Sequence, residues 1–177
     1  YNFQGLFFHK HVDELIKYFS SLWGDYDLII SPLLEGGHQD HDTVCATLLL
    51  SRELSGKYSK LLLYSTYRNY KIFPWIYQCG VSKSIFSNYL YTIKIPKNIV
   101  FILLKTILLC YRSQLKTWVL LFPALIFSMI RSNYGKYVLA DNLEFKDLIK
   151  LIPRKPLYEI YRGLKPKDWL KAFKGKK

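Results

Sequence analysis

The chain has 177 residues, of which half are hydrophobic and 17% aromatic, and its formal net charge is +13. This length suits one domain, and the apolar content excludes a disordered chain. The charge is uneven, because residues 1–53 sum to −5, residues 54–140 hold twelve basic and no acidic residues, and residues 141–177 sum to +6. The basic, aromatic middle suits a surface facing anionic lipid headgroups or phosphates, and a core with solvated lysines is the alternative.

The first predicted elements are a helix, a strand and a second helix. Apolar residues within 12–23 recur at the spacing of one helical face, and Gly24 ends that helix. The run Leu28–Ile30 is predicted to be a short buried strand. Val44–Leu54 is predicted to be a helix that stops near Gly56.

The middle of the chain continues this alternation. Apolar patterns of period two predict strands at Leu61–Tyr67 and Tyr89–Ile95, and Lys97–Lys116 is predicted to be a long helix. The hydrophobic stretches 99–110 and 118–130 both fall short of the ~20 residues that span a bilayer. We expect buried helices there, and the alternative is peripheral membrane contact through Trp118, Phe122 and Phe127.

The order of strands and helices predicts an α/β fold, specifically a Rossmann-like sheet with helices on both faces. We expect residues 1–164 to belong to a single domain and residues 165–177 to be a basic tail, frayed or bound to a surface. The three cysteines are far apart in apolar stretches, which argues against a disulfide framework and favours a reducing, intracellular setting: Cys45, Cys79 and Cys110.

A polar cluster lies between the first predicted strand and the helix after it, and it reads Glu35-Gly36-Gly37-His38-Gln39-Asp40-His41-Asp42. Open α/β sheets place their chemistry at such strand-to-helix turns. Imidazole is a good zinc ligand, and two histidines three apart can point toward one pocket, one binding metal and one polarising substrate. Asp40, between them, can fix a ring tautomer, and the glycines leave space for a ligand. The alternative is a polar helix cap formed by Asp40 or Asp42, with the histidines in solvent.

The cluster, preceded by a strand and a proline, resembles the second conserved block of the PIG-L/LmbE-like deacetylases. These are zinc hydrolases that remove acetyl groups from N-acetylglucosamine-type sugars. The run Tyr111-Arg112-Ser113-Gln114, at the end of the long predicted helix, resembles the Ser-Gln element found downstream in that family. The run Pro156-Leu157-Tyr158-Glu159 resembles the family's C-terminal end. Together the matches cover most of the chain.

The resemblance implies a role for three residues of the cluster. His41 corresponds to a zinc ligand, although other divalent ions suit such a site. His38 corresponds to the residue that assists the transition state as an electrostatic stabiliser or acid, and Asp40 to the residue that orients it. The implied reaction is hydrolysis of an acetamide by a water that zinc activates, leaving acetate and a free amine. The implied substrate is an N-acetylated amino sugar, free or lipid-linked. We expect the protein itself in the cytoplasm, with or without membrane association.

One part of the family pattern is absent from the sequence. The family's first block, His-Pro-Asp-Asp-Glu, supplies two further metal ligands and the general base, and the chain has no His-Pro pair. We therefore interpret residues 1–164 as the C-terminal portion of one deacetylase domain, with a sheet incomplete at its N-terminus. On this interpretation the chain alone neither holds zinc tightly nor turns over substrate.

Two alternatives concern other residues and another function. His9, His11, Asp13 and Glu14 are candidate replacements for the missing ligands, but we favour a helix N-terminus whose acids face its dipole favourably. A non-catalytic protein that binds a glycan or a membrane surface on the same scaffold is the alternative to an enzyme. Nucleic acid is not expected, because no Arg-rich helix or recognisable reader module accompanies the positive charge.

Overall fold

The computed structural model describes residues 8–56, 59–66, 68–69, 77–78, 90–94, 97–110, 134–140, 143–150, 152–153 and 156–176. In chain order its elements are η1 (Phe8–Lys10), α1 (Val12–Leu22), β1 (Leu28–Pro32), α2 (Gln39–Ser55), β2 (Lys60–Tyr64), β3 (Arg68–Asn69), β4 (Tyr77–Gln78), β5 (Leu90–Lys94), α4 (Lys97–Cys110), β6 (Tyr134–Leu139), α6 (Phe145–Ile149), α7 (Leu157–Arg162) and α8 (Pro166–Lys171). The predicted mixture of helices and strands is confirmed.

The strands form a four-stranded sheet in the order β1-β2-β6-β5, and β3 pairs with β4 in a separate ribbon. β1 and β2 run parallel, with Leu28 opposite Lys60, and α2 connects them. β6 runs antiparallel to both β2 and β5. Parallel strands need a long crossover connection, so α2 is the crossover of a β1-α2-β2 unit. The sheet as described is therefore mixed, and its parallel part is this unit.

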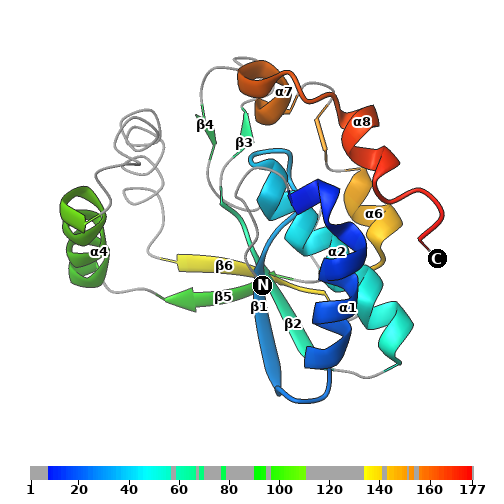
Figure 1. Ribbon diagram of the computed structural model, residues 1–177. Coiled ribbons are helices and arrows are strands. Elements are labelled where there is room, and N and C mark those ends of the chain that lie inside the picture. The colour runs from blue at the N-terminus through cyan, green and yellow to red at the C-terminus, as the bar shows by residue number, and fades with distance from the viewer. Residues whose placement is uncertain are drawn as a thin grey trace.

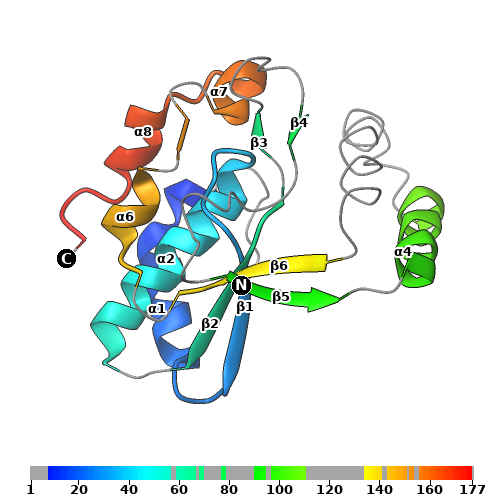
Figure 2. The same ribbon diagram turned by 180° about the vertical axis from the view of Figure 1, so that it is seen from behind.

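Two helices cover one face of the β1-β2 part of the sheet. α1 and α2 pass in front of these strands in Figure 1 and behind them in Figure 2. Leu61 and Leu63 of β2 are fully buried and belong to the same core as residues of both helices. On β1, Leu28 and Ile30 alternate with core-facing Ile29 and are 45% and 55% exposed. Within the described ranges, the opposite face is therefore open to solvent at these two positions.

The helix α2 begins within the polar cluster, five residues earlier than predicted. His38 has an extended backbone (φ −130°, ψ 128°), and its Nδ1 accepts a hydrogen bond of 3.2 Å from the amide of Asp40. This is the geometry of an N-cap residue, and Asp40 and Asp42 in the first turn face the helix dipole favourably. The cluster is therefore half turn and half helix, whereas the sequence predicted a turn throughout. Gly56, in the left-handed region at φ 62°, ends the helix as predicted.

The other predicted helices and strands are found where the structure describes them, but the burial expected for two of them is not. The predicted buried strand is exposed at Leu28 and Ile30. The helix expected to be buried within 99–110 is 43–61% exposed at Ile99, Ile102 and Leu109. The reason is that the described elements do not fully cover either set of side chains.

The bounds of the remaining predicted elements agree in part with the structure. β5 lies within its predicted stretch, whereas β2 runs from Lys60 to Tyr64 instead of Leu61 to Tyr67. α4 covers the first part of the predicted long helix. The motif at 111–114, the stretch 118–130 and the rest of the long helix lie outside the described residues. Among the helices of the described part, none has the length and apolar character needed to cross a membrane.

The lysine-rich end of the chain is folded, unlike the frayed or surface-bound tail that its composition predicted. α8 occupies much of this segment, and its Trp169 is fully buried. The indole Nε1 of Trp169 donates a hydrogen bond of 2.9 Å to Thr43 Oγ1 in the first turns of α2. The rings of Trp169 and Phe173 lie 4.6 Å apart, so apolar residues between the lysines attach this segment to the core.

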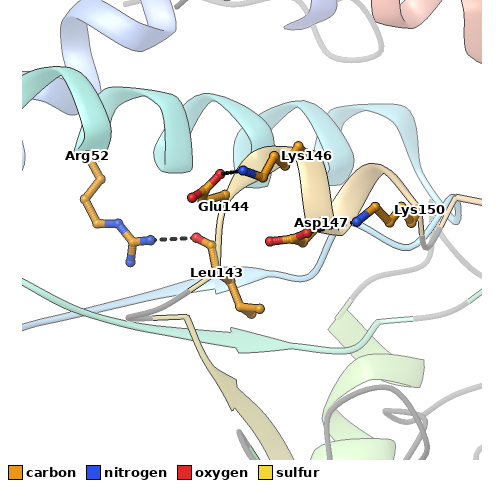
Figure 3. A network of polar contacts seen from close by, with 6 residues as sticks. All are labelled: Arg52, Leu143, Glu144, Lys146, Asp147 and Lys150. Atoms are coloured by element: carbon orange, nitrogen blue, oxygen red, sulfur yellow. Dashed lines mark hydrogen bonds and ion pairs between the residues drawn. The ribbon is translucent and has the colours of Figure 1, made fainter.

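A buried arginine connects α2 to the end of β6. Arg52 is only 6% exposed, and its guanidinium donates to the carbonyl oxygens of Ala140 (2.8 Å) and Leu143 (2.9 Å). Figure 3 shows the bond to Leu143 beside the first turn of α6. The charge is taken up by backbone carbonyls, as a buried guanidinium requires. Arg52 therefore fixes the position at which the chain leaves the sheet.

Candidate functional site

The polar cluster has two sides, which face different parts of the molecule. The framework side consists of Glu35, Gly36 and Asp42, all buried. The imidazole side consists of His38, Asp40 and His41, of which both histidines are partly exposed. Both sides lie at the carboxyl end of β1 and the start of α2, where open α/β sheets hold their ligands.

Asp42 fixes the turn between β1 and α2. It is fully buried, and its carboxyl oxygens accept hydrogen bonds from the backbone amides of Glu35 (3.0 Å) and Gly36 (3.0 and 3.2 Å). Burial raises the pKa of this carboxyl well above its usual range, and the two amide donors act in the opposite direction. Asp42 is therefore a structural residue, whose carboxyl oxygens are bonded to the backbone amides of the turn.

Gly36 cannot be replaced without strain in this turn. Its φ is +78°, a conformation that residues with a side chain adopt at a cost. A Cβ there would lie 2.5 Å from Pro153 Cδ and 3.1 Å from Pro156 Cβ. The glycine is thus required for two independent reasons, the backbone conformation and the close approach of the segment before α7.

Glu35 joins the ends of the two parallel strands. It is 2% exposed, and its carboxylate accepts hydrogen bonds from Ser65 Oγ (2.8 Å), Thr66 Oγ1 (3.0 Å) and the Thr66 amide (2.5 Å). These donors lie just beyond β2, so the carboxylate holds the loops after β1 and β2 together. Two of the three acidic residues in the cluster, Glu35 and Asp42, therefore accept hydrogen bonds from backbone amides and hold the loops in place.

The two histidine rings lie side by side at the start of α2. Their centroids are 4.9 Å apart and their planes are tilted by 38°. Burial and the neighbouring His38 lower the pKa of His41 to about 4, and the charge of Asp40 opposes this shift. His41 is therefore neutral at physiological pH, which is the form of imidazole that donates a lone pair to a metal. The sequence predicted that the histidines share a site, and the structure brings them together.

Asp40 lies between the two histidines in sequence and is 8% exposed. Its amide bonds to His38 Nδ1, as described above, and its Oδ1 accepts a hydrogen bond of 3.3 Å from the amide of Phe8 in η1. The residue thus positions the His38 ring through its backbone and contacts η1 through its carboxylate. The carboxylate acts on His41 through its charge, and the orienting role that the resemblance implied for Asp40 stays a prediction.

The four candidate replacement ligands near the start of the chain lie in two different surroundings. His9 lies in η1, where burial and Lys10 lower its pKa and Asp40 raises it. His9 Nδ1 is buried and has no hydrogen-bond partner in the described part. His11 is bonded to Glu14 at 3.2 Å, and Asp13 and Glu14 lie in the first turn of α1, as a helix N-terminus predicts. The described residues contain no group of three or more histidine, cysteine or acidic side chains arranged to hold a metal.

Tyr158 is a polar residue near the site to which no individual role was assigned from the sequence. It lies in α7, is 3% exposed, and its hydroxyl has no hydrogen-bond partner in the described part of the chain. Burial, with the charge of Asp42 next, raises the pKa of this phenol far above its usual range. α7 therefore places the Tyr158 hydroxyl, which has no hydrogen-bond partner in the described part, close enough to Asp42 to be affected by its charge. Tyr158 belongs to the run Pro156–Glu159, which resembles the family's C-terminal end.

Comparison of the chain with protein-family models, with curated proteins and with solved structures finds no match. The resemblance to the deacetylases therefore depends on the sequence motifs alone. What the structure describes is a pair of neighbouring imidazoles at the end of a parallel β1-α2-β2 unit.

Proposed function

We propose that this chain contributes to a zinc-dependent hydrolase that removes the N-acetyl group from an N-acetylglucosamine-type sugar or glycoconjugate. The finer fold prediction, a Rossmann-like sheet with helices on both faces, is part of the same proposal, as is a cytoplasmic location. The observation that carries the proposal is the pair of imidazoles, His38 and His41, 4.9 Å apart at the carboxyl end of a parallel strand. Zinc or another divalent ion, when bound, would activate water and polarise the acetamide carbonyl.

Each residue of the imidazole side has a distinct part in this proposal. His41 is the metal ligand, since its ring is neutral and partly buried. His38, beside it, stabilises negative charge that develops on the carbonyl oxygen, or donates a proton to the leaving amine. Asp40 holds the His38 ring through its amide. The framework side keeps these groups in place and excludes water from the turn beneath them.

The remaining metal ligands have to come from a further segment. Within the described sheet, β1 has a neighbouring strand on one side, β2. The other edge of β1 can accept a parallel strand, whose carboxyl end would then meet the carboxyl end of β1 beside His41. We therefore propose that the 177-residue chain alone binds zinc weakly and does not hydrolyse substrate.

The test has a binding arm and an activity arm. Zinc is titrated into the 177-residue chain while the histidine ring signals are followed by NMR, and we expect weak binding that shifts His38 and His41. His41→Ala should abolish this shift, whereas His11→Ala, at an exposed imidazole bonded to Glu14, should preserve it. Amine release from N-acetylglucosamine derivatives is then measured with the product of the complete reading frame that encodes this chain. Absence of zinc and of amine release from that product would contradict the proposal.

The alternative is a non-catalytic protein that binds a glycan or a membrane surface on the same scaffold. The exposed apolar residues of β1, Leu28 and Ile30, favour some contact on that face. The activity arm separates the two functions, because a binder would retain N-acetylglucosamine derivatives without releasing amine. In that case His41→Ala would leave glycan binding unchanged.

A further inference from the structure

A pocket of about 410 Å³, wide open to solvent, lies between α6 and α8. Apolar side chains from both helices line it: Phe145, Ile149, Leu170 and Phe173. This volume lies within the range of pockets that bind small molecules, and such pockets are mostly apolar. The pocket is therefore large enough for part of an amphipathic ligand.

The remaining side chains of the pocket lining are three lysines, Lys167, Lys171 and Lys174, with no acidic residue among them. Lys171 is paired with Asp168 at 2.9 Å. Lys167 and Lys174 form no ion pair with any residue that the structure describes. The hydrogen bond from Lys171 lowers the pKa of the neighbouring Asp168, and the charge of Lys167 adds to this effect. The pocket therefore combines an apolar lining with two lysines that make no direct ion pair within the described residues.

Other lysines of the same region differ from these two. On α6, Lys146 is paired with Glu144 and Lys150 with Asp147, and Figure 3 shows both contacts. Around the pocket, by contrast, Asp168 is paired with Lys171, and Lys167 and Lys174 have no direct ion pair among the described residues. Residues 165–177 contain six lysines and one aspartate, so the region around the pocket carries a strong positive charge.

We propose that the α6–α8 pocket binds the phosphate-bearing headgroup of an anionic membrane lipid. Lys167 and Lys174 would contact the phosphate, and the apolar lining would accept the glycerol and first methylene groups of the lipid. Clusters of four to eight lysines attract anionic membrane surfaces. A free phosphate would use only the lysines and leave the apolar lining exposed. This inference does not depend on the proposed hydrolase, and it assigns membrane contact to residues other than the stretch 118–130.

The test measures binding of the full 177-residue chain to sedimented vesicles. One set is phosphatidylcholine alone, and the other is phosphatidylcholine mixed with phosphatidylglycerol. We expect binding to the mixed vesicles at low salt and its loss at high salt. Lys167→Gln combined with Lys174→Gln should lower the partition coefficient about thirtyfold, the effect of removing two lysines near an anionic surface.

A matched control has the same net charge as the double variant. Lys60→Gln combined with Lys105→Gln removes two exposed lysines at β2 and α4, outside the pocket, and should lower binding less than threefold. Equal losses in the two double variants would overturn the assignment to this pocket, as would failure of the chain to bind the mixed vesicles. Soluble glycerophosphoglycerol that binds as tightly as the vesicles would overturn the choice of a membrane lipid. Thermal unfolding of both double variants checks that they are folded.

Discussion

The two sides of the cluster at residues 35–42 differ in what their side chains are bonded to. On the framework side, the carboxyl groups of Glu35 and Asp42 accept hydrogen bonds from backbone amides and hydroxyls. Both residues are buried, as is Gly36 between them. On the imidazole side, His38 and His41 face each other and are partly exposed. Within one run of eight residues, the acidic side chains of the framework side therefore bond to the surrounding backbone, while the two imidazoles remain accessible to a ligand. This difference separates the residues expected to control stability from those expected to control chemistry.

The largest expected effect is at the framework side. Gly36→Ala should lower the free energy of unfolding by about 4 kcal/mol, because it combines left-handed backbone strain with a close contact to Pro153. Gly56→Ala is the matched control, since Gly56 also has a positive φ (62°) but has nothing within 4 Å of an added Cβ. Its cost should be about 1 kcal/mol. Urea unfolding measures both, and equal costs would show that the proline contact does not matter.

An intermediate effect is expected at the imidazole side, as a dependence of stability on pH. The pKa of His41 is about 4 in the folded chain against 6.5 in the unfolded chain, so the unfolded state binds the proton first as pH falls. The contribution of His41 is therefore complete above pH 6.5 and is lost between pH 6.5 and about 4. Allowing for partial exposure, the loss should be on the order of 2 kcal/mol.

Unfolding by urea across this pH range measures the loss. The His41→Gln variant should show a flatter profile, because it lacks the group that titrates. The exposed His11 provides the comparison, and His11→Gln should retain the slope of the parent chain. A profile of His41→Gln identical to that of the parent would contradict the assignment to His41.

The smallest effect is expected at Tyr158. Its hydroxyl is buried without a partner in the described part of the chain, so Tyr158→Phe should change the free energy of unfolding by less than about 1 kcal/mol and can raise it. A loss well above that value would show that the hydroxyl makes a bond that stabilises the fold. If Tyr158→Phe leaves the fold stable but slows amine release when it is introduced into the complete protein, the hydroxyl contributes to the reaction together with His38 and His41.

Short-range patterns predicted much of the fold. α1 and the strands β2 and β5 follow from apolar periodicity, and the end of α2 follows from Gly56. The predicted start of α2 at Val44 is five residues too late, because the first turn consists of polar residues and therefore shows no apolar periodicity. In the structure two of those residues, Asp40 and Asp42, are acidic groups that interact favourably with the helix dipole.

The division of the site could not be predicted, because it depends on contacts between distant segments. The sequence shows three carboxylates but not which of them is buried against amides, as Asp42 is. The need for glycine at position 36 comes from Pro153 and Pro156, which no local pattern connects to it. Residues 165–177 were predicted to be a tail because six of them are lysines, whereas the apolar residues between the lysines, with Trp169 at their centre, pack in the same core as α2. The neighbouring histidines, by contrast, were predictable because they are three residues apart on one helix start.

The hydrogen bond from Trp169 to Thr43 has a consequence for how the protein is made. The two residues are separated by 126 positions, and Thr43 directly follows the framework residue Asp42. During synthesis, the start of α2 leaves the ribosome long before the tryptophan that completes its packing. Contacts of such sequence separation form slowly, so the packing around the start of α2 is completed only after the α8 segment has been synthesised.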